Sequence, residues 1–105
     1  MEIPGSIIRS WRARATEESA GQYVAFFDRL RVQLAQLAGF RGALVMTRVE
    51  DRDLVEISVL TFWDSMDAVT AFASPDVERA VVEPEAQELL LSYDNIVRHY
   101  TIASR

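Results

Sequence analysis

The sequence predicts an α+β domain of the ferredoxin-like class, with a four-stranded antiparallel sheet and helices on one of its faces. Apolar residues alternate with period two in four separate segments, and helical periodicity fills the gaps after the first and the third. Only the two middle strand segments are joined by a short turn. With right-handed crossovers, this βαββαβ order gives the ferredoxin-like sheet. The chain of 105 residues has the length of a single domain, spanning residues 1–105.

The first strand and the first helix follow from a change of period. Residues 6–14 alternate between apolar and polar positions and predict a strand. Thr16 is placed as an N-cap, and the two glutamates that follow it suit the positive end of a helix dipole. Apolar residues then recur at steps of three and four as far as Ala38, with Gly39 in the position of a helix-ending glycine.

The remaining elements are shorter. Residues 42–49 and 54–62 predict a hairpin whose turn is the polar run 50–53. Ser65 predicts the cap of a helix of about two turns. Proline follows a capping position twice, which predicts further short helices over 75–82 and 84–91. Residues 95–102 alternate again and predict the last strand.

Apolar side chains occur on both faces of the predicted sheet, although helices cover only one. In the third strand Ile57 and Val59 face one side, whereas Leu60 and Phe62 face the other. In so short a chain the economical cover for the second face is another copy of the sheet, which predicts a homodimer. Four polar strand residues are expected to line any cavity left between the two sheets: Arg9, Ser58, Arg98 and His99.

Composition excludes several classes of chemistry. The chain has eleven arginines and no lysine, one histidine and no cysteine. Schiff-base enzymes, pyridoxal-phosphate sites and P-loops need a lysine, whereas thiol catalysis, disulfides and thiolate metal sites need cysteine. His99 cannot form a multi-histidine metal centre, although a mixed carboxylate site or a single axial haem ligand stays open. The chemistry that remains is acid–base work by carboxylates, His99 or tyrosine, and for it we expect no metal and no cofactor.

Charge and hydropathy bear on partners and location. The formal net charge is -5, and the acidic stretch from Asp76 to Glu88 would repel a phosphate backbone, so nucleic acid is not an expected partner. That stretch lacks the spacing of a calcium loop and is interpreted as a solvated helix face. No apolar run reaches the roughly 18 residues of a membrane span, and the first residues lack signal-peptide features. We expect a cytoplasmic protein that does not bind membranes.

Four segments of the chain carry a resemblance to a known family. They are residues 8–12 (IRSWR), 59–65 (VLTFWDS), 72–81 (FASPDVERAV) and 97–100 (VRHY). Together they resemble the antibiotic biosynthesis monooxygenase (ABM) domain family of dimeric α/β barrels, over nearly the whole chain. The resemblance implies a dimeric α/β barrel. It also implies a function among cofactor-independent oxygenases of aromatic polyketides, haem-degrading enzymes, small-molecule isomerases and members without known activity.

The family's functional residues match only in part. Haem-degrading members pair an asparagine on the first strand with a tryptophan and a histidine on the following helix. Here the first strand has Ser10, and no histidine follows Trp63. Polyketide monooxygenases have an asparagine shortly before the tryptophan, where this chain has Val59 and Thr61. They have a tyrosine beyond the tryptophan, where this chain has Val69 and Phe72. Haem degradation of that type is therefore disfavoured, and Trp63 alone matches both patterns.

Three residues are candidates for catalysis. His99 is the one side chain whose ordinary pKa lies near neutrality, so it could act as a base or proton shuttle. Arg9, on one strand face, needs either a carboxylate partner such as Glu56 or an anionic ligand, and could stabilise an oxyanion. Trp63 could wall an aromatic pocket with its indole N–H toward a substrate oxygen. The alternatives are a structural hydrogen bond for His99, a buried ion pair for Arg9 and simple packing for Trp63.

A second set of residues is expected to bind the substrate in an apolar pocket between sheet and helices. Its members are Trp11, Met46, Phe62, Phe72 and Tyr100. The leading functional hypothesis is a cofactor-independent monooxygenase, or a related small-molecule enzyme, acting on an apolar aromatic or polyketide-like substrate. A non-catalytic ligand-binding or dimerisation module and a haem-binding protein remain as alternatives.

Overall fold

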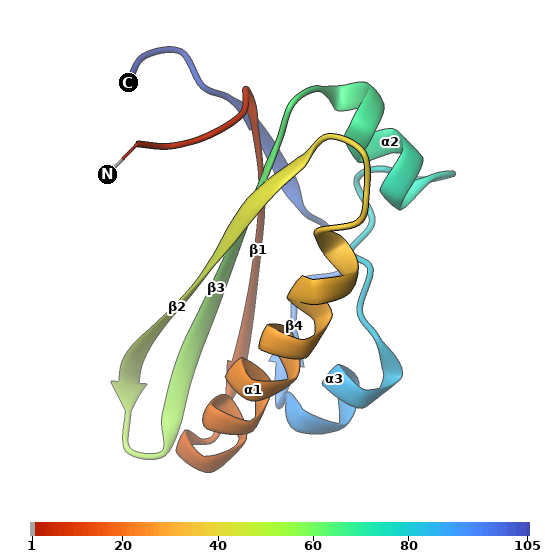
Figure 1. Ribbon diagram of the computed structural model, residues 1–105. Helices are drawn as coiled ribbons and strands as arrows, with labels where there is room; N and C mark the ends of the chain where they lie inside the picture. The colour runs from red at the N-terminus through yellow and green to blue at the C-terminus, as the bar shows by residue number, and fades with distance from the viewer. Residues whose placement is uncertain (1) are drawn as a thin grey trace.

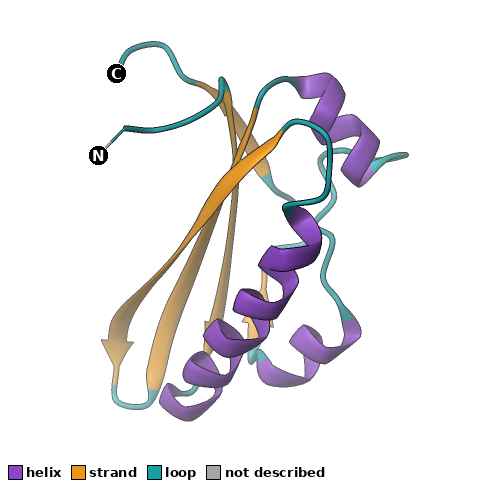
Figure 2. Ribbon diagram, viewed as in Figure 1, coloured by secondary structure: helices purple, strands orange, loops and turns teal. Residues whose placement is uncertain are grey.

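The computed structural model describes residues 2–105 and has two layers, a sheet and the helices that pack on one of its faces (Figures 1 and 2). The sheet contains five strands, and every paired neighbour is antiparallel. The strands are β1 (Ile7–Ala15), β2 (Phe40–Asp51), β3 (Leu54–Trp63), β4 (Ser92–Tyr93) and β5 (Arg98–Thr101). The helices are α1 (Glu17–Leu34), α2 (Met66–Ala73) and α3 (Pro84–Leu89). The predicted α+β, ferredoxin-like architecture is confirmed.

The strand order places β1 in the middle of the sheet. The order is β2-β3-β1-β4, and β5 also pairs with β1. β5 pairs with the start of β1, from Ile7 to Ser10, and β4 pairs with its end, at Ala13 and Arg14. Two short strands thus lie along one edge of β1. Only β5 falls within the predicted last strand, residues 95–102, and β4 was not predicted.

The expectation that one strand covers residues 95–102 is wrong in its first part. The amide of Val97 donates to the carbonyl of Glu78 at 2.8 Å, and the amide of Ala80 donates to the carbonyl of Asn95 at 2.8 Å. An isolated bridge joins Arg79 to Ile96. The backbone between β4 and β5 therefore pairs with the chain that arrives from α2.

The same pairing explains why no helix forms over residues 75–82, which corrects the prediction made from Ser74 and Pro75. The chain there is irregular apart from short turns. We call residues 74–83, which run from α2 to α3, the strap. Because the middle of the strap donates and accepts sheet-like hydrogen bonds, its amides are not available for helical ones.

Two of the predicted helix starts, at Thr16 and Ser65, are confirmed by N-cap hydrogen bonds. Thr16 Oγ1 accepts from the amide of Ser19 at 3.1 Å, and Ser65 Oγ accepts from the amide of Ala68 at 3.2 Å. α1 ends at Leu34, short of the predicted Ala38, and the chain turns to reach β2 at Phe40.

The core lies between the sheet and the helices. Odd-numbered residues of β1 and β3 point toward α1, where Ile57 and Val59 pack with Tyr23 and Phe27. Trp63 belongs to a second cluster with Ile7 and Val69 of α2. The even-numbered residues face the opposite side of the sheet, where no helix packs in Figure 1.

That opposite face is partly apolar. Met46 is 41% exposed and Tyr100 is 52% exposed, whereas Phe62 is buried. The homodimer predicted from this face stays a prediction, as does the cytoplasmic location. None of the helices formed by residues 2–105 has the length and apolar character required to span a membrane.

Candidate functional site

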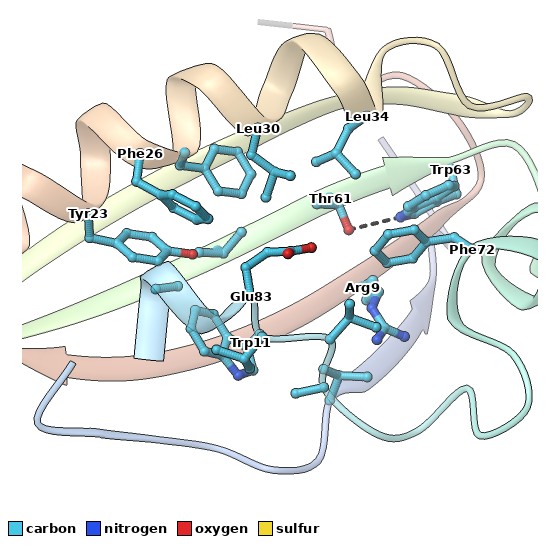
Figure 3. A pocket seen from close by; sticks show the side chains of 17 residues that line it. Arg9, Trp11, Tyr23, Phe26, Leu30, Leu34, Thr61, Trp63, Phe72 and Glu83 are labelled. Atoms are coloured by element: carbon cyan, nitrogen blue, oxygen red, sulfur yellow. Dashed lines mark hydrogen bonds between the residues drawn. The ribbon is translucent and has the colours of Figure 1, made fainter. Parts of the chain in front are cut away.

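A cavity of about 90 Å³ lies between the sheet, α1 and the strap (Figure 3). Most of its lining is aromatic or aliphatic, and Arg9, Thr61 and Glu83 are the polar exceptions besides the hydroxyl of Tyr23. The lining residues are Arg9, Trp11, Tyr23, Phe26, Phe27, Leu30, Leu34, Val59, Thr61, Trp63, Phe72, Ala80, Val81, Val82, Glu83, Ala86 and Val97. Such an apolar cavity with a few convergent polar groups is typical of a site for a small molecule.

Arg9 is the cation of this cavity. It is only 6% exposed, and its guanidinium donates from Nη1 to the carbonyl of Val77 at 2.7 Å and from Nη2 to the carbonyl of Arg79 at 3.0 Å. Both acceptors belong to the strap. The guanidinium carbon lies 5.6 Å from the ring centre of Phe72. The strap therefore holds the guanidinium through backbone oxygens.

No carboxylate of residues 2–105 lies within 4.0 Å of the Arg9 guanidinium. The predicted partner Glu56 is on the opposite face of the sheet, 3.8 Å from Arg48, so a pair between Arg9 and Glu56 is wrong. Burial lowers the pKa of Arg9, but an arginine stays protonated at neutral pH. A buried positive charge without a carboxylate favours an anionic ligand.

His99 lies beside Arg9 and points to the same face. The two residues are partners across β1 and β5, with Nη1 of Arg9 3.0 Å from Nε2 of His99. Because a guanidinium has no acceptor, Nε2 must accept and the ring proton must be on Nδ1. Burial lowers the pKa of His99, the charge of Arg9 lowers it further, and Glu78 acts in the opposite direction. His99 is therefore held neutral.

These positions correct the expectation that four polar residues line a cavity between two sheets. Arg9 and His99 face the helices, whereas Ser58 and Arg98 are on the opposite face. His99 is outside the lining of the cavity and reaches it only through Arg9.

Trp63 forms a wall of the cavity and is fully buried. Its Nε1 donates to Thr61 Oγ1 at 2.8 Å, as the dashed line in Figure 3 marks. Phe40 and Phe72 each pack with their ring centres 5.3 Å from that of Trp63. The indole N–H is thus used inside the protein, which corrects the expectation that it points to a substrate oxygen.

The predicted substrate-binding residues are divided between the two faces of the sheet. Trp11 and Phe72 line the cavity. Met46, Phe62 and Tyr100 are even-numbered strand residues on the opposite face, so they are not part of it. The strand register explains the difference, because only odd-numbered side chains of these strands point toward the helices.

Glu83 is the lining residue that the sequence interpretation missed. It occupies the N-cap position of α3 but forms no side-chain cap hydrogen bond. Figure 3 shows its carboxylate extending into the space between Tyr23, Leu30 and Thr61. Its place in the acidic stretch predicted a solvated residue, and Glu83 is exposed although it lines the cavity. The apolar Val81 and Val82 just before it, which also line the cavity, were the available signal for this wall.

Metal binding has little support from the side chains. Within residues 2–105 no three carboxylate, imidazole or thiol groups come together in a way that could hold a metal ion.

Comparisons with known proteins give structural matches only. No family model matches the chain, and no curated protein matches it. Among solved structures, a Bacillus cereus protein described as a candidate antibiotic biosynthesis monooxygenase is similar with a TM-score of 0.68 and 16% identity, covering 97% of both chains. A candidate antibiotic biosynthesis monooxygenase from Deinococcus radiodurans has a TM-score of 0.62 and 14% identity, covering 94% of both chains.

Two further structures belong to proteins with named activities. The haem-degrader MhuD of Mycobacterium tuberculosis, solved with two haems in its active site, has a TM-score of 0.59 and 14% identity, covering 94% of this chain and 97% of its own. SnoaB of Streptomyces nogalater, a cofactor-independent oxygenase, has a TM-score of 0.51 and 14% identity, covering 96% of this chain and 95% of its own. The chain therefore has the fold of the antibiotic biosynthesis monooxygenase structures, and the resemblance predicted from its sequence segments is confirmed for the fold.

Proposed function

We propose that this chain is a cofactor-independent monooxygenase, or a related small-molecule enzyme, that binds an apolar aromatic or polyketide-like substrate as an oxyanion. The observation that carries the proposal is Arg9, a buried cation without a carboxylate partner in a cavity with aromatic walls. Three of its five N–H groups have partners in the described chain, which leaves two for a ligand. A phenolate or enolate oxygen meets both the charge and the donors.

The contact between Arg9 and the substrate oxygen also activates the substrate for its reaction with oxygen. Arg9 favours the ionised form of a phenol or enol, so it lowers the pKa of the bound substrate. The resulting carbanion character makes the substrate electron-rich enough to reduce molecular oxygen directly. For an anthrone, the methylene carbon becomes a carbonyl: one oxygen atom is retained in the product, and the other leaves as water with the two hydrogens. All the electrons that reduce O2 come from the substrate, so the reaction needs no other reductant.

The volume of the cavity restricts how a substrate fits. About 90 Å³ is less than the roughly 150 Å³ of an engineered cavity that holds benzene. Val81 and Glu83 line the cavity and are exposed, so it opens along the strap. We expect one ring edge and its oxygen to enter toward Arg9 while the remaining rings lie in the opening.

His99 and Trp63 retain supporting roles in the proposal. His99 orients Arg9 through the contact with Nε2. Trp63 forms an aromatic wall of the cavity, and its hydrogen bond to Thr61 fixes the orientation of the indole. A homodimer through the open sheet face completes the proposal. SnoaB supports the cofactor-independent reaction as a structural neighbour that is named as such an oxygenase.

The test is oxygen uptake with anthrone. We expect uptake by the unaltered protein and a loss of at least tenfold in Arg9→Gln, because a charge-assisted hydrogen bond contributes about 1.5–3 kcal/mol. Arg52→Gln is the matched control, since Arg52 is an exposed arginine in the turn between β2 and β3 and does not line the cavity. Equal rates in the two variants would reject Arg9 as the oxyanion partner.

The alternative is a non-catalytic module that binds a small ligand or only dimerises. The small volume of the cavity and the engagement of His99 with Arg9 favour it. Saturable binding of anthrone without oxygen uptake would support a binding module. A Soret band on haem titration that is lost in His99→Gln would instead support the haem-binding alternative.

A further inference from the structure

Glu83 is a carboxylate inside a largely apolar lining, and nothing in the described chain holds it there. No hydrogen bond or ion pair involves its side chain within residues 2–105. Its backbone starts α3, because its carbonyl accepts from the amide of Gln87 at 3.0 Å and Pro84 follows it. The main chain is therefore well placed while the carboxylate stays free.

Other acidic residues nearby already have structural explanations. Glu85, two positions later, pairs with Arg29 and so joins α3 to α1. Glu88 is exposed on the same short helix. Neither of them lines the cavity, and the carboxylate of Glu83 alone extends into it among these three (Figure 3). The attachment of α3 to α1 thus has no need of Glu83.

Glu83 and Arg9 line the same cavity, and their side chains have different chemical roles. A carboxylate accepts a proton, whereas a guanidinium donates hydrogen bonds and does not accept. Glu83 enters from the strap and Arg9 from the sheet, so a flat ligand in the opening can meet both. Because Glu83 is also exposed, a proton that it takes can pass to water.

We infer that Glu83 is the general base of this cavity, and that with Arg9 it interconverts a ketone and its enolate without oxygen. The Glu83 carboxylate forms an O–H bond as a C–H bond conjugated with the substrate carbonyl breaks, which in anthrone is a methylene C–H across the central ring. The electron pair moves through the conjugated ring, and the negative charge appears on the oxygen that Arg9 binds. Return of the proton restores the ketone, so no oxidant is consumed. The inference rests on the proposed function for its cavity and its oxyanion partner.

Hydrogen exchange under argon tests this step. Anthrone is incubated in D2O with the protein, and loss of the methylene proton signal is followed by NMR. We expect the unaltered protein to accelerate exchange over buffer and Glu83→Gln to lose about 100-fold or more of that acceleration, the lower range for general-base catalysis. Glu88→Gln makes the same change of charge on α3 outside the cavity and should exchange within twofold of the unaltered protein.

Two additional measurements separate loss of the base from loss of the fold. Glu83→Asp keeps a carboxylate on a shorter side chain and should recover part of the exchange rate. Thermal unfolding of Glu83→Gln should match that of the unaltered protein, because the side chain has no partner to lose. Exchange in Glu83→Gln at the full rate, or no acceleration by the unaltered protein, would overturn the inference.

Oxygen uptake distinguishes this inference from the proposed function. Exchange under argon without uptake in air would retain Glu83 as a base and reject the oxygenase. Uptake at the full rate in Glu83→Gln would support the oxygenase and reject Glu83 as its base.

Discussion

Nη1 of Arg9 lies 3.0 Å from Nε2 of His99, 90 residues later in the chain. The pairing of β1 with β5 brings the two together on the face that packs against the helices. Since the guanidinium can only donate, the contact exists only while the imidazole is neutral. The single histidine of the chain is therefore coupled to the single arginine that lines the cavity.

This coupling predicts a loss of stability in mild acid. The folded state lowers the pKa of His99 below its ordinary 6.5, so the unfolded chain binds the proton first as the pH falls. Stability should be fully present above about pH 7 and should decrease as the pH falls through 6.5 toward the folded pKa. Urea unfolding between pH 7.5 and 5 measures it.

His99→Gln is the control, because its amide oxygen can still accept from Arg9 and it does not titrate. The variant should lose less stability than the unaltered protein over this range. Equal losses in both proteins would contradict a lowered pKa of His99.

Removal of the Thr61 hydroxyl should destabilise the protein. Thr61→Val keeps the shape but leaves the buried Nε1 of Trp63 without an acceptor, which costs about 1–3 kcal/mol. Thr47→Val changes an exposed threonine on β2 and should shift the free energy of unfolding by less than about 0.5 kcal/mol. A chemical denaturation curve of each variant checks the difference, and equal values would exclude a contribution from the Trp63 hydrogen bond.

Two glycine substitutions should have opposite effects. Gly21 is inside α1, and a Cβ there meets nothing within 4 Å, so Gly21→Ala should stabilise by about 0.5–1 kcal/mol. Gly39 has φ +84°, and a Cβ there would be 2.5 Å from the Cβ of Ala68. Gly39→Ala should therefore lower the melting temperature, whereas Gly21→Ala should raise it. Shifts of the same sign would contradict this assignment of the two sites.

The open sheet face should form the predicted homodimer. Leu60 points to this face and lies between Ser10 of β1 and Leu44 of β2. Leu60→Arg places a charge in the predicted interface and should convert a dimer to a monomer in sedimentation at micromolar concentration. Val32→Arg, at an exposed apolar position on α1, should leave the dimer intact. A monomeric unaltered protein would reject this interface.

The elements of the fold could be predicted because their signals are local. Period-two alternation places β1 and β3 within one or two residues, and the hydroxyls of Thr16 and Ser65 cap the helices that they predict. The prediction of a helix over residues 75–82 was wrong because the contacts that decide this segment are not local. Its serine and proline are local signals, whereas its backbone hydrogen bonds join residues 78–80 to residues 95–97.

The candidate site could be predicted only in part. Alternation places Arg9, Trp11 and Trp63 on one face because all three are odd-numbered residues of paired strands. The same rule would have put Met46 and Phe62 on the other face, had register been used to divide the substrate-binding set. The alternation in the sequence was thus sufficient to assign these strand residues to the two faces of the sheet, but the predicted substrate-binding set did not use it.

By itself the sequence determined the order of the elements, the two-faced sheet and the presence of a buried arginine, because alternation, capping and charge are properties of neighbouring residues. Only the tertiary structure decided what Arg9 meets, since its partners Val77, Arg79 and His99 come from segments 68 to 90 residues away. The same holds for Glu83, whose role depends on the strap passing over the sheet. Contacts between distant segments depend on how the chain closes its loops, and no local pattern encodes that closure.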